Sequence, residues 1–227
     1  KMRIAVLAAM DKELALLLSV MPGHEEIEIE GRKYYKGEIG GKEVIAGKCG
    51  IGKVNAALNT LRLIEHIHPD LVINSGVAGG ASDDIGIGEV LVADQIAYHD
   101  VWCGPGTEYG AADGYDLFFH PYGKGLDGCK AKELKVKYGL ICSGDKFIHT
   151  AEEIKDIKSH FDNVMAVDME SAAIAQACAS CGVPVMIVRV MSDQPGKGDN
   201  VAQYKDFWGV APKKTFECVE HIIKDVL

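Results

Sequence analysis

The chain alternates short apolar runs, rich in β-branched residues, with longer amphipathic segments, and this alternation constrains its fold more than any other feature. The apolar runs predict buried strands at Arg3–Ala8, Leu71–Asn74, Glu89–Tyr98, Tyr138–Cys142 and Val185–Met191. Helical periodicity predicts helices at Asp11–Val20, Gly52–His66, Ala151–His160, Glu170–Cys181 and within Ala211–Leu227. Strands that alternate with helices predict an α/β domain, with a mostly parallel or mixed central sheet covered on both faces.

Two segments depart from this alternation. Arg32–Ile39 and Glu43–Cys49 flank Gly40–Gly41, and a glycine pair between two such runs predicts a β-hairpin with a two-residue turn. Trp102–Gly125 contains Gly-Pro-Gly and several aromatic residues but shows no periodicity. We therefore interpret Trp102–Gly125 as a long loop.

Length and charge limit the classes of protein that the chain can represent. Its 227 residues suit one large domain, and no repeat or low-complexity linker divides them, so we expect a single domain over residues 1–227. A net charge of −9 argues against nucleic acid or an anionic membrane as a partner, because both repel an acidic surface. No apolar run approaches the roughly 20 residues of a membrane span, and the first run is too short for a signal peptide. Scattered cysteines in apolar stretches are typical of reduced thiols and favour a cytoplasmic protein.

Charged residues gather where the predicted strands end, which is where α/β sheets of this kind bind ligands. Glu13 follows the first strand, and the last buried-type strand contains Arg189 and ends in Ser192 and Asp193. A buried arginine needs a carboxylate partner, because an unpaired buried charge is costly. We expect Glu13 or Glu170 to be that partner. A structural ion pair without chemistry is the alternative, but several carboxylates and an arginine at strand ends favour a functional site.

Three further segments have both a structural and a functional interpretation. Asp11 and Glu13 lie in the first turn of a predicted helix, where carboxylates often only cap the helix. Ser75–Ala81 consists largely of small residues and predicts a tight turn after Leu71–Asn74, which would also let a ligand approach the backbone. It lacks the glycine spacing of phosphate-binding and dinucleotide-binding loops. Phe147 offers a flat apolar face for a base, although a lone phenylalanine more often packs in a core.

Six short segments follow one another in the order found in one enzyme family. They are Ala9–Glu13 (AMDKE), Gly50–Ala57 (GIGKVNAA), Ala78–Gly80 (AGG), Ser143–Ile148 (SGDKFI), Val167–Glu170 (VDME) and Val188–Asp193 (VRVMSD). Through them, nearly from end to end, the chain resembles the bacterial 5′-methylthioadenosine/S-adenosylhomocysteine nucleosidases of the nucleoside phosphorylase superfamily. The resemblance implies a three-layer α/β/α fold around a mixed, partly barrel-like sheet, assembled as a homodimer. It also implies hydrolysis of the N-glycosidic bond of these two purine nucleosides, with release of adenine and without a metal or cofactor.

The same resemblance implies a role for individual residues. Glu13 would activate the attacking water, and Asp193 would protonate adenine N7 while Ser192 orients it. Glu170 would hold the ribose hydroxyls beside Met169. The resemblance brings further residues to the site. Phe147 and Ile148 would bind adenine, and Arg189 would lie near the water and Glu13. The other positions that would line the pocket are Met10, Ile51, Gly79 and Val167.

These residue types suit the cleavage of an N-glycosidic bond. Cleavage builds positive charge on the ribose and negative charge on the leaving base, so adenine leaves readily only if an acid protonates it near neutral pH. A second carboxylate must be ionised to take the proton of water. A third can accept hydrogen bonds from the ribose hydroxyls and stabilise the neighbouring oxocarbenium. Asp193, Glu13 and Glu170 are the respective candidates.

Two departures from the family leave alternatives open. Val77 stands where well-known bacterial members carry serine, and Trp102–Gly125, which in the family covers the 5′ substituent across the dimer, has an unusual sequence. A hydrolase of another purine nucleoside, such as futalosine, is therefore one alternative. A phosphate-dependent purine nucleoside phosphorylase is another, but Glu13 would repel phosphate and Asn74–Gly80 contains no arginine. A binding protein without catalysis is disfavoured, because Glu13 and Asp193 are both present.

Overall fold

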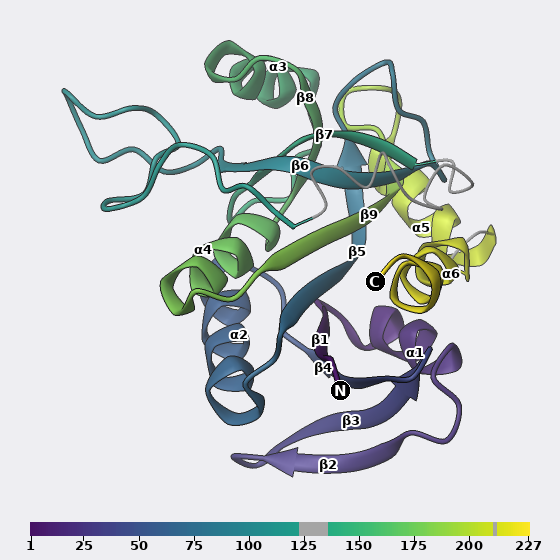
Figure 1. Ribbon diagram of the computed structural model, residues 1–227. Helices are drawn as coiled ribbons and strands as arrows, with labels where there is room; N and C mark the ends of the chain where they lie inside the picture. The colour runs from purple at the N-terminus through teal and green to yellow at the C-terminus, as the bar shows by residue number, and fades with distance from the viewer. Residues whose placement is uncertain (123–135, 211–212) are drawn as a thin grey trace.

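Nine strands form one continuous sheet in the computed structural model, which describes residues 1–122, 136–210 and 213–227 (Figure 1). The strands are β1 (Arg3–Ala8), β2 (Glu25–Ile29), β3 (Arg32–Ile39), β4 (Lys42–Lys48), β5 (Leu71–Gly80), β6 (Val90–Tyr98), β7 (Val136–Ser143), β8 (Val164–Asp168) and β9 (Val185–Asp193). Their order in the sheet is β2-β3-β4-β1-β5-β8-β7-β6-β9, and β5 also pairs with β9.

The additional pairing of β5 with β9 closes five of these strands into a barrel. Neighbours β5–β9, β6–β7 and β7–β8 are parallel, whereas β5–β8 and β6–β9 are antiparallel. The other strands extend from β5 as an open arm, in which β1 runs parallel to both β4 and β5. The prediction of a mixed, partly barrel-like sheet is confirmed.

The glycine pair between β3 and β4 forms the expected two-residue hairpin turn. The two strands are antiparallel, and Ile39 lies opposite Lys42. Gly40 and Gly41 have φ angles of 56° and 77°. Glycine adopts such positive angles without steric cost, and two of them in succession match the twist of the flanking strands.

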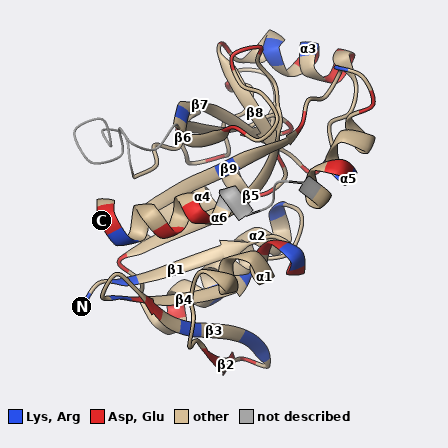
Figure 2. Ribbon diagram, turned by 90° about the vertical axis from the view of Figure 1, so that its right-hand side faces the viewer, with Lys and Arg blue, Asp and Glu red and all other residues tan. Residues whose placement is uncertain are grey.

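Helices cover both faces of the sheet, as the three-layer prediction requires (Figure 1). On one face α2 (Lys53–Ile67) packs against α4 (Ser171–Cys181), and on the other α1 (Asp11–Ser19) packs against α6 (Lys213–His221). The remaining helices are α3 (Ala151–His160), α5 (Asn200–Val210), which packs on β9, and the short π-helix η3 (Ile222–Val226). Figure 2 shows the barrel strands largely free of charged residues, which concentrate on helices, β2 and β3. Apolar packing between the layers therefore holds the barrel in place.

Strand β5 is longer than its apolar run predicted. The expected strand at Leu71–Asn74 continues through the small residues to Gly80, so the prediction of a tight turn at Ser75–Ala81 is wrong. β5 pairs with β9 as far as Gly79 and with β8 at Gly79 and Gly80. A Cβ at Gly79 would lie 2.9 Å from the Pro195 side chain. Glycine thus lets one strand meet two neighbours where the barrel closes.

Strands β2 and β8 and helix α5 have no counterpart in the predictions from sequence. Residues 102–122 form no helix or strand, apart from a bridge between Phe119 and Ile96, which agrees with the predicted loop. Residues 123–125 of that loop, and residues 211 and 212 of the last helical segment, lie outside the described residues. Within the described ranges, no helix has the length and apolar character needed to cross a membrane.

Candidate active site

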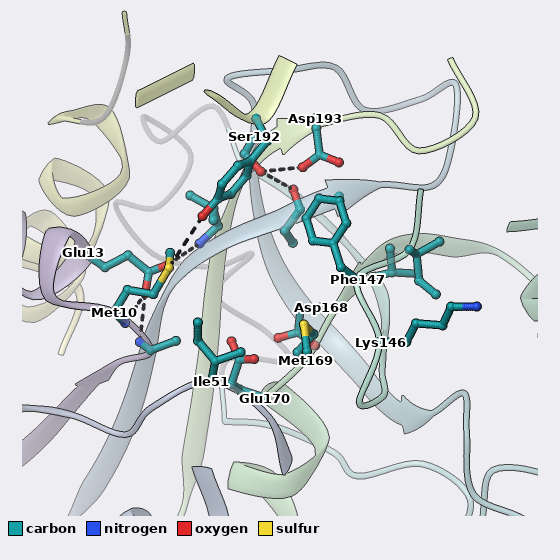
Figure 3. A pocket seen from close by; sticks show the side chains of 17 residues that line it. Met10, Glu13, Ile51, Lys146, Phe147, Asp168, Met169, Glu170, Ser192 and Asp193 are labelled. Carbon is teal, nitrogen blue, oxygen red and sulfur yellow. Dashed lines mark hydrogen bonds between the residues drawn. The ribbon is translucent and has the colours of Figure 1, made fainter. Parts of the chain in front are cut away.

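A pocket lies at the carboxyl ends of β1, β5, β8 and β9, at the edge of the sheet where the sequence predicted a site (Figure 3). The loops after β4 and β7 and one residue of α5 complete its walls. The predicted site residues that line the pocket are Met10, Glu13, Ile51, Gly79, Phe147, Ile148, Val167, Met169, Glu170, Ser192 and Asp193. Segments far apart in the sequence therefore meet in one cavity, and of the predicted residues only Arg189 lies off its wall.

Asp193 is buried at the end of β9, with 2% of its surface exposed. Ser192 Oγ donates a hydrogen bond to Asp193 Oδ1 at 2.6 Å, and Asn200 Nδ2 donates to Asp193 Oδ2 at 2.8 Å. Burial raises the pKa of Asp193 above its ordinary value, and these two hydrogen bonds oppose the rise without cancelling it. A raised pKa favours the protonated carboxyl, which is the form that a general acid requires.

Glu13 lies in the first turn of α1 and is equally buried, although it faces the pocket. Its Oε2 accepts hydrogen bonds from the backbone N–H of Ala9 at 2.8 Å and of Met10 at 3.1 Å, and its Oε1 accepts one from Val77 N–H at 3.2 Å. The carboxylate thus caps the helix and also belongs to the site. Burial raises the pKa of Glu13, while the guanidinium of Arg189 and the backbone donors oppose the rise. Val77 supplies no hydroxyl, but its N–H still orients Glu13.

Glu170 precedes α4 and lies across the pocket from Asp193 (Figure 3). Gly52 N–H donates to Glu170 Oε2 at 3.4 Å, a long hydrogen bond that leaves the carboxylate further capacity to accept. Burial raises the pKa of Glu170, and the neighbouring carboxylate of Asp168 raises it further. A buried carboxylate with unused acceptor positions is suited to the hydroxyl groups of a sugar.

Arg189 lies beneath the pocket and is 1% exposed. Its Nη2 is 2.9 Å from Asp168 Oδ2 and also donates to Asn74 Oδ1. The prediction that Glu13 or Glu170 pairs with Arg189 is therefore wrong, because Asp168 at the end of β8 is its ion-pair partner. Backbone N–H groups, rather than the guanidinium, hold the carboxylates of Glu13 and Glu170. Arg189 influences these two carboxylates only through its nearby charge.

Aromatic side chains form one wall of the pocket. The rings of Phe147 and Tyr204 meet edge to face, with centroids 5.9 Å apart and an angle of 77° between their planes. The Tyr204 hydroxyl lies 3.5 Å from Met10 Sδ, which joins this wall to the loop after β1. Phe147 is 43% exposed, so its face is open to a flat ligand. Lys146 turns away from the cavity and pairs with Glu153 (Figure 3).

Two residues of α5 contribute to the site without having been identified from the sequence. Tyr204 lines the pocket, and Asn200 Nδ2 donates both to Asp193 and, at 3.3 Å, to the carbonyl oxygen of Ile148. Asn200 thereby connects the acid to the loop that carries Phe147. The apolar residues of α5 do not gather on one face, so the periodicity that identified other helices was missing here.

The pocket thus combines four buried carboxylates with an open aromatic face. Asp168 is paired with Arg189, and the other three lie in different surroundings. Asp193 has neutral hydrogen-bond donors, Glu13 has three backbone donors near a guanidinium, and Glu170 has a single long hydrogen bond. Titratable groups held in different environments can divide the work of acid and base. Among the described residues, no group of three or more His, Cys, Asp and Glu side chains is placed to hold a metal ion.

Comparisons with known proteins identify the family of the chain. The sequence profile of the phosphorylase superfamily matches residues 3–224. A 5′-methylthioadenosine/S-adenosylhomocysteine nucleosidase of Listeria monocytogenes serotype 4b is 36% identical over 234 residues, which cover 99% of this chain and 100% of the relative.

Solved structures give the same assignment. A nucleosidase of the same name from S. pneumoniae, solved with a transition-state inhibitor, has a TM-score of 0.91 and 33% identity. The match covers 100% of this chain and 100% of that one. The S-adenosylhomocysteine nucleosidase of Streptococcus pyogenes, solved with 5-methylthiotubericidin, has a TM-score of 0.91 and 34% identity, over 99% of this chain and 97% of that one. The chain therefore belongs to the phosphorylase superfamily and, within it, to the family of 5′-methylthioadenosine/S-adenosylhomocysteine nucleosidases.

Proposed function

We propose that this pocket hydrolyses the N-glycosidic bond of 5′-methylthioadenosine and S-adenosylhomocysteine, releasing adenine and the thioribose product. Relatives that match the whole chain carry this activity in their names, and the solved relative from S. pneumoniae holds a transition-state inhibitor. The environment of Asp193 is the observation that carries the mechanism. A carboxyl buried at a strand end, held by two neutral donors and raised in pKa, is equipped to donate a proton to a leaving base.

In the proposed reaction, the bond between C1′ and the purine nitrogen breaks while Asp193 delivers its proton to adenine N7. Phe147 stacks on the base, and the backbone of Ile148 bonds to its edge. Asn200 supports this arrangement, because it bonds both to Asp193 and to the Ile148 carbonyl. The acid and the loop that binds the base are thus held at a fixed separation, which is the purpose of positioning in catalysis.

Glu13 takes the proton of the attacking water as the new bond between C1′ and oxygen forms. Its three backbone donors aim the carboxylate, and the raised pKa makes it a stronger base than an exposed glutamate. Glu170 binds the ribose hydroxyls, and its negative charge stabilises the oxocarbenium that develops on the ribose. Met10, Ile51, Gly79, Val167 and Met169 enclose the sugar and its 5′ group.

Water, and not phosphate, is the nucleophile that this pocket favours. A dianionic phosphate needs basic groups. Two cations near the cavity are otherwise engaged, since Lys146 pairs with Glu153 and Arg189 pairs with Asp168. Glu13 would stand beside the phosphate and repel it. These charges argue against a phosphate-dependent phosphorylase.

The direct test is to measure free base released from a panel of purine nucleosides, with and without phosphate. We expect adenine from 5′-methylthioadenosine and S-adenosylhomocysteine at a rate that phosphate does not change. A requirement for phosphate would establish a phosphorylase instead. Activity confined to a different purine nucleoside, such as futalosine, would overturn the assignment of the substrate.

The chain also has an exposed apolar face suited to a second copy. A groove between α2, α4 and the loop after β6 is lined largely by apolar side chains, and Val54, Leu58 and Trp102 near it are 67%, 57% and 56% exposed. Exposed apolar areas of this kind mark protein interfaces. We propose a homodimer formed through this face, in which the partner's loop covers the pocket beside Ile51. Light scattering that shows a stable monomer at micromolar concentration would contradict it.

The proposed setting is the cytoplasm, with a small-molecule nucleoside as the ligand. The net charge of −9 disfavours nucleic acid and anionic membranes as partners. The described cysteines are all free, as in a reducing compartment. Fractionation of cells that express the tagged chain tests this placement, and recovery in a membrane or secreted fraction would contradict it.

A further inference from the structure

Lys53, Asp100 and Asp145 form a closed ring of hydrogen bonds, through side chains and backbone N–H groups, beside the pocket and outside the residues that line it. Lys53 Nζ donates to Asp100 Oδ1 at 2.9 Å, and Asp100 Oδ2 accepts a hydrogen bond from Asp145 N–H at 2.8 Å. Asp145 Oδ1 then accepts one from Lys53 N–H at 2.7 Å. The ring joins the start of α2, the segment after β6 and the loop after β7.

Asp145 satisfies one of the backbone N–H groups at the start of α2 that have no partner within the helix. The N-cap residue of α2 is Gly52, which has no side chain, and the first turn of the helix contains no acidic residue. Asp145 comes from another loop and supplies the missing acceptor to Lys53 N–H. A negative charge at this end of the helix also favours its dipole. Gly52 is closely fitted to this contact, since a Cβ there would lie 3.1 Å from Asp145 Oδ1.

The contact between Asp145 and Lys53 connects two walls of the pocket. On one side, Ile51 lines the pocket and Gly52 N–H bonds to Glu170, directly before the capped helix. On the other side, Phe147 follows Asp145 by two residues in the loop after β7. The sugar side and the base side of the pocket thus meet at this cross-loop cap.

We propose that Asp145 is a positioning residue that sets the separation between the base-binding loop and the ribose-binding loop. The inference rests on the proposed function, because it assumes that a nucleoside spans these two loops. Asp145 touches neither Glu13 nor Asp193, which have their own hydrogen-bond partners. Its loss should therefore affect nucleoside binding more than the chemical step.

The acceptor oxygen of Asp145, rather than its charge, carries most of this effect. The side chains of Lys53, Asp100 and Asp145 are 22%, 30% and 47% exposed, and ion pairs this accessible contribute little. Lys53 Nζ is 3.9 Å from Asp145 Oδ2, which is long for a hydrogen bond. Asparagine keeps an acceptor for Lys53 N–H, whereas alanine removes it.

The test compares Asp145→Ala with Asp145→Asn, using 5′-methylthioadenosine as the substrate. We expect Asp145→Ala to raise KM about tenfold, as one lost cap and displaced loops imply, with a smaller change in kcat. Asp145→Asn should restore KM to within about twofold of the wild type. Lys53→Pro removes the same N–H from the other partner and is tolerated at the first position of a helix, so it should raise KM like Asp145→Ala. It also gives the answer if Asp145→Ala does not fold.

Asp70→Ala is the matched control. Asp70 Oδ2 accepts a hydrogen bond from Arg3 N–H at 2.7 Å, again across distant segments, but at the amino end of β5, opposite the pocket. Its loss should lower the melting temperature without changing KM. An unchanged KM in Asp145→Ala and Lys53→Pro, or an equal rise in Asp70→Ala, would overturn the inference. Wild-type protein that releases no adenine would instead overturn the proposed function.

Discussion

Replacing Asp193 with asparagine removes the proposed proton donor with almost no change in shape. The asparagine oxygen can accept from Asn200 Nδ2, which lies 2.8 Å from the carboxyl in the wild type. The amide NH2 of the new asparagine can donate to Ser192 Oγ. The Ser192 hydroxyl can then donate its own hydrogen to the Ala78 carbonyl oxygen, 3.4 Å away. Both partners of Asp193 therefore stay satisfied, and we expect the variant to fold and to bind substrate.

The expected loss of activity follows from the proton that the base requires. General acid catalysis contributes about 10²- to 10⁴-fold in rate, so we expect kcat to fall by about 10³-fold, or roughly 4 kcal/mol of activation free energy. The free energy of unfolding of Asp193→Asn, in contrast to its kcat, should be higher than that of the wild type near neutral pH. Because burial raises the pKa of Asp193, its contribution to stability is complete at low pH and is lost as pH rises through the raised pKa. Asparagine does not ionise and avoids that loss.

Two assays on the same variant test this reasoning. Chromatography of free adenine after incubation with 5′-methylthioadenosine gives kcat, and titration calorimetry gives the affinity of the intact nucleoside. Turnover within tenfold of the wild type would remove Asp193 from the role of acid. A variant that no longer binds the nucleoside would show that Asp193 serves binding rather than proton transfer.

Three further predictions concern the other charged groups. Glu13→Gln should abolish adenine release while calorimetry still detects nucleoside binding; measurable turnover would remove Glu13 from the role of base. The pH profile of kcat/KM should be bell-shaped, falling at low pH as Glu13 is protonated and at high pH as Asp193 ionises. Because burial raises both pKa values, the low-pH limb should lie above the ordinary 4.5 of glutamate and the high-pH limb above the ordinary 3.8 of aspartate. A limb at an ordinary value would contradict this prediction. Arg189→Met leaves the buried Asp168 carboxylate without its cation and should lower the free energy of unfolding by urea by about 3–5 kcal/mol. Lys197→Met, whose partner Asp83 is exposed, should lower it far less; equal losses would refute the buried pair.

Local patterns predicted the parts of the fold that local chemistry decides. The glycine pair at Gly40–Gly41 determines its own turn, and the helix at Ala151–His160 begins and ends where its periodicity does. β5 was misjudged because small residues usually mark turns, whereas here they give room to neighbours. A Cβ at Gly76 would lie 2.8 Å from Glu13 Oε1, a contact that no local pattern reveals.

The candidate site shows the same division between local and long-range information. The burial of Arg189 correctly predicted a carboxylate partner, but three acidic residues lie near it and only the barrel brings Asp168 Oδ2 to 2.9 Å. Asn200 was missed because its importance depends on its bonds to Asp193 and Ile148, both of which come from other segments. The ends of the strands could therefore be identified from the sequence, whereas the pairing between them required the closed barrel.

Adenine release in water enriched in heavy oxygen shows whether water is the nucleophile that attacks C1′. If Glu13 activates water and Asp193 protonates the base, the heavy oxygen must appear on C1′ of the thioribose product, and adenine must carry none. Mass spectrometry of the two products distinguishes the outcomes. We predict one heavy oxygen per sugar released, whether or not phosphate is present. A sugar phosphate, or a sugar without the label before exchange with solvent, would contradict hydrolysis in this pocket.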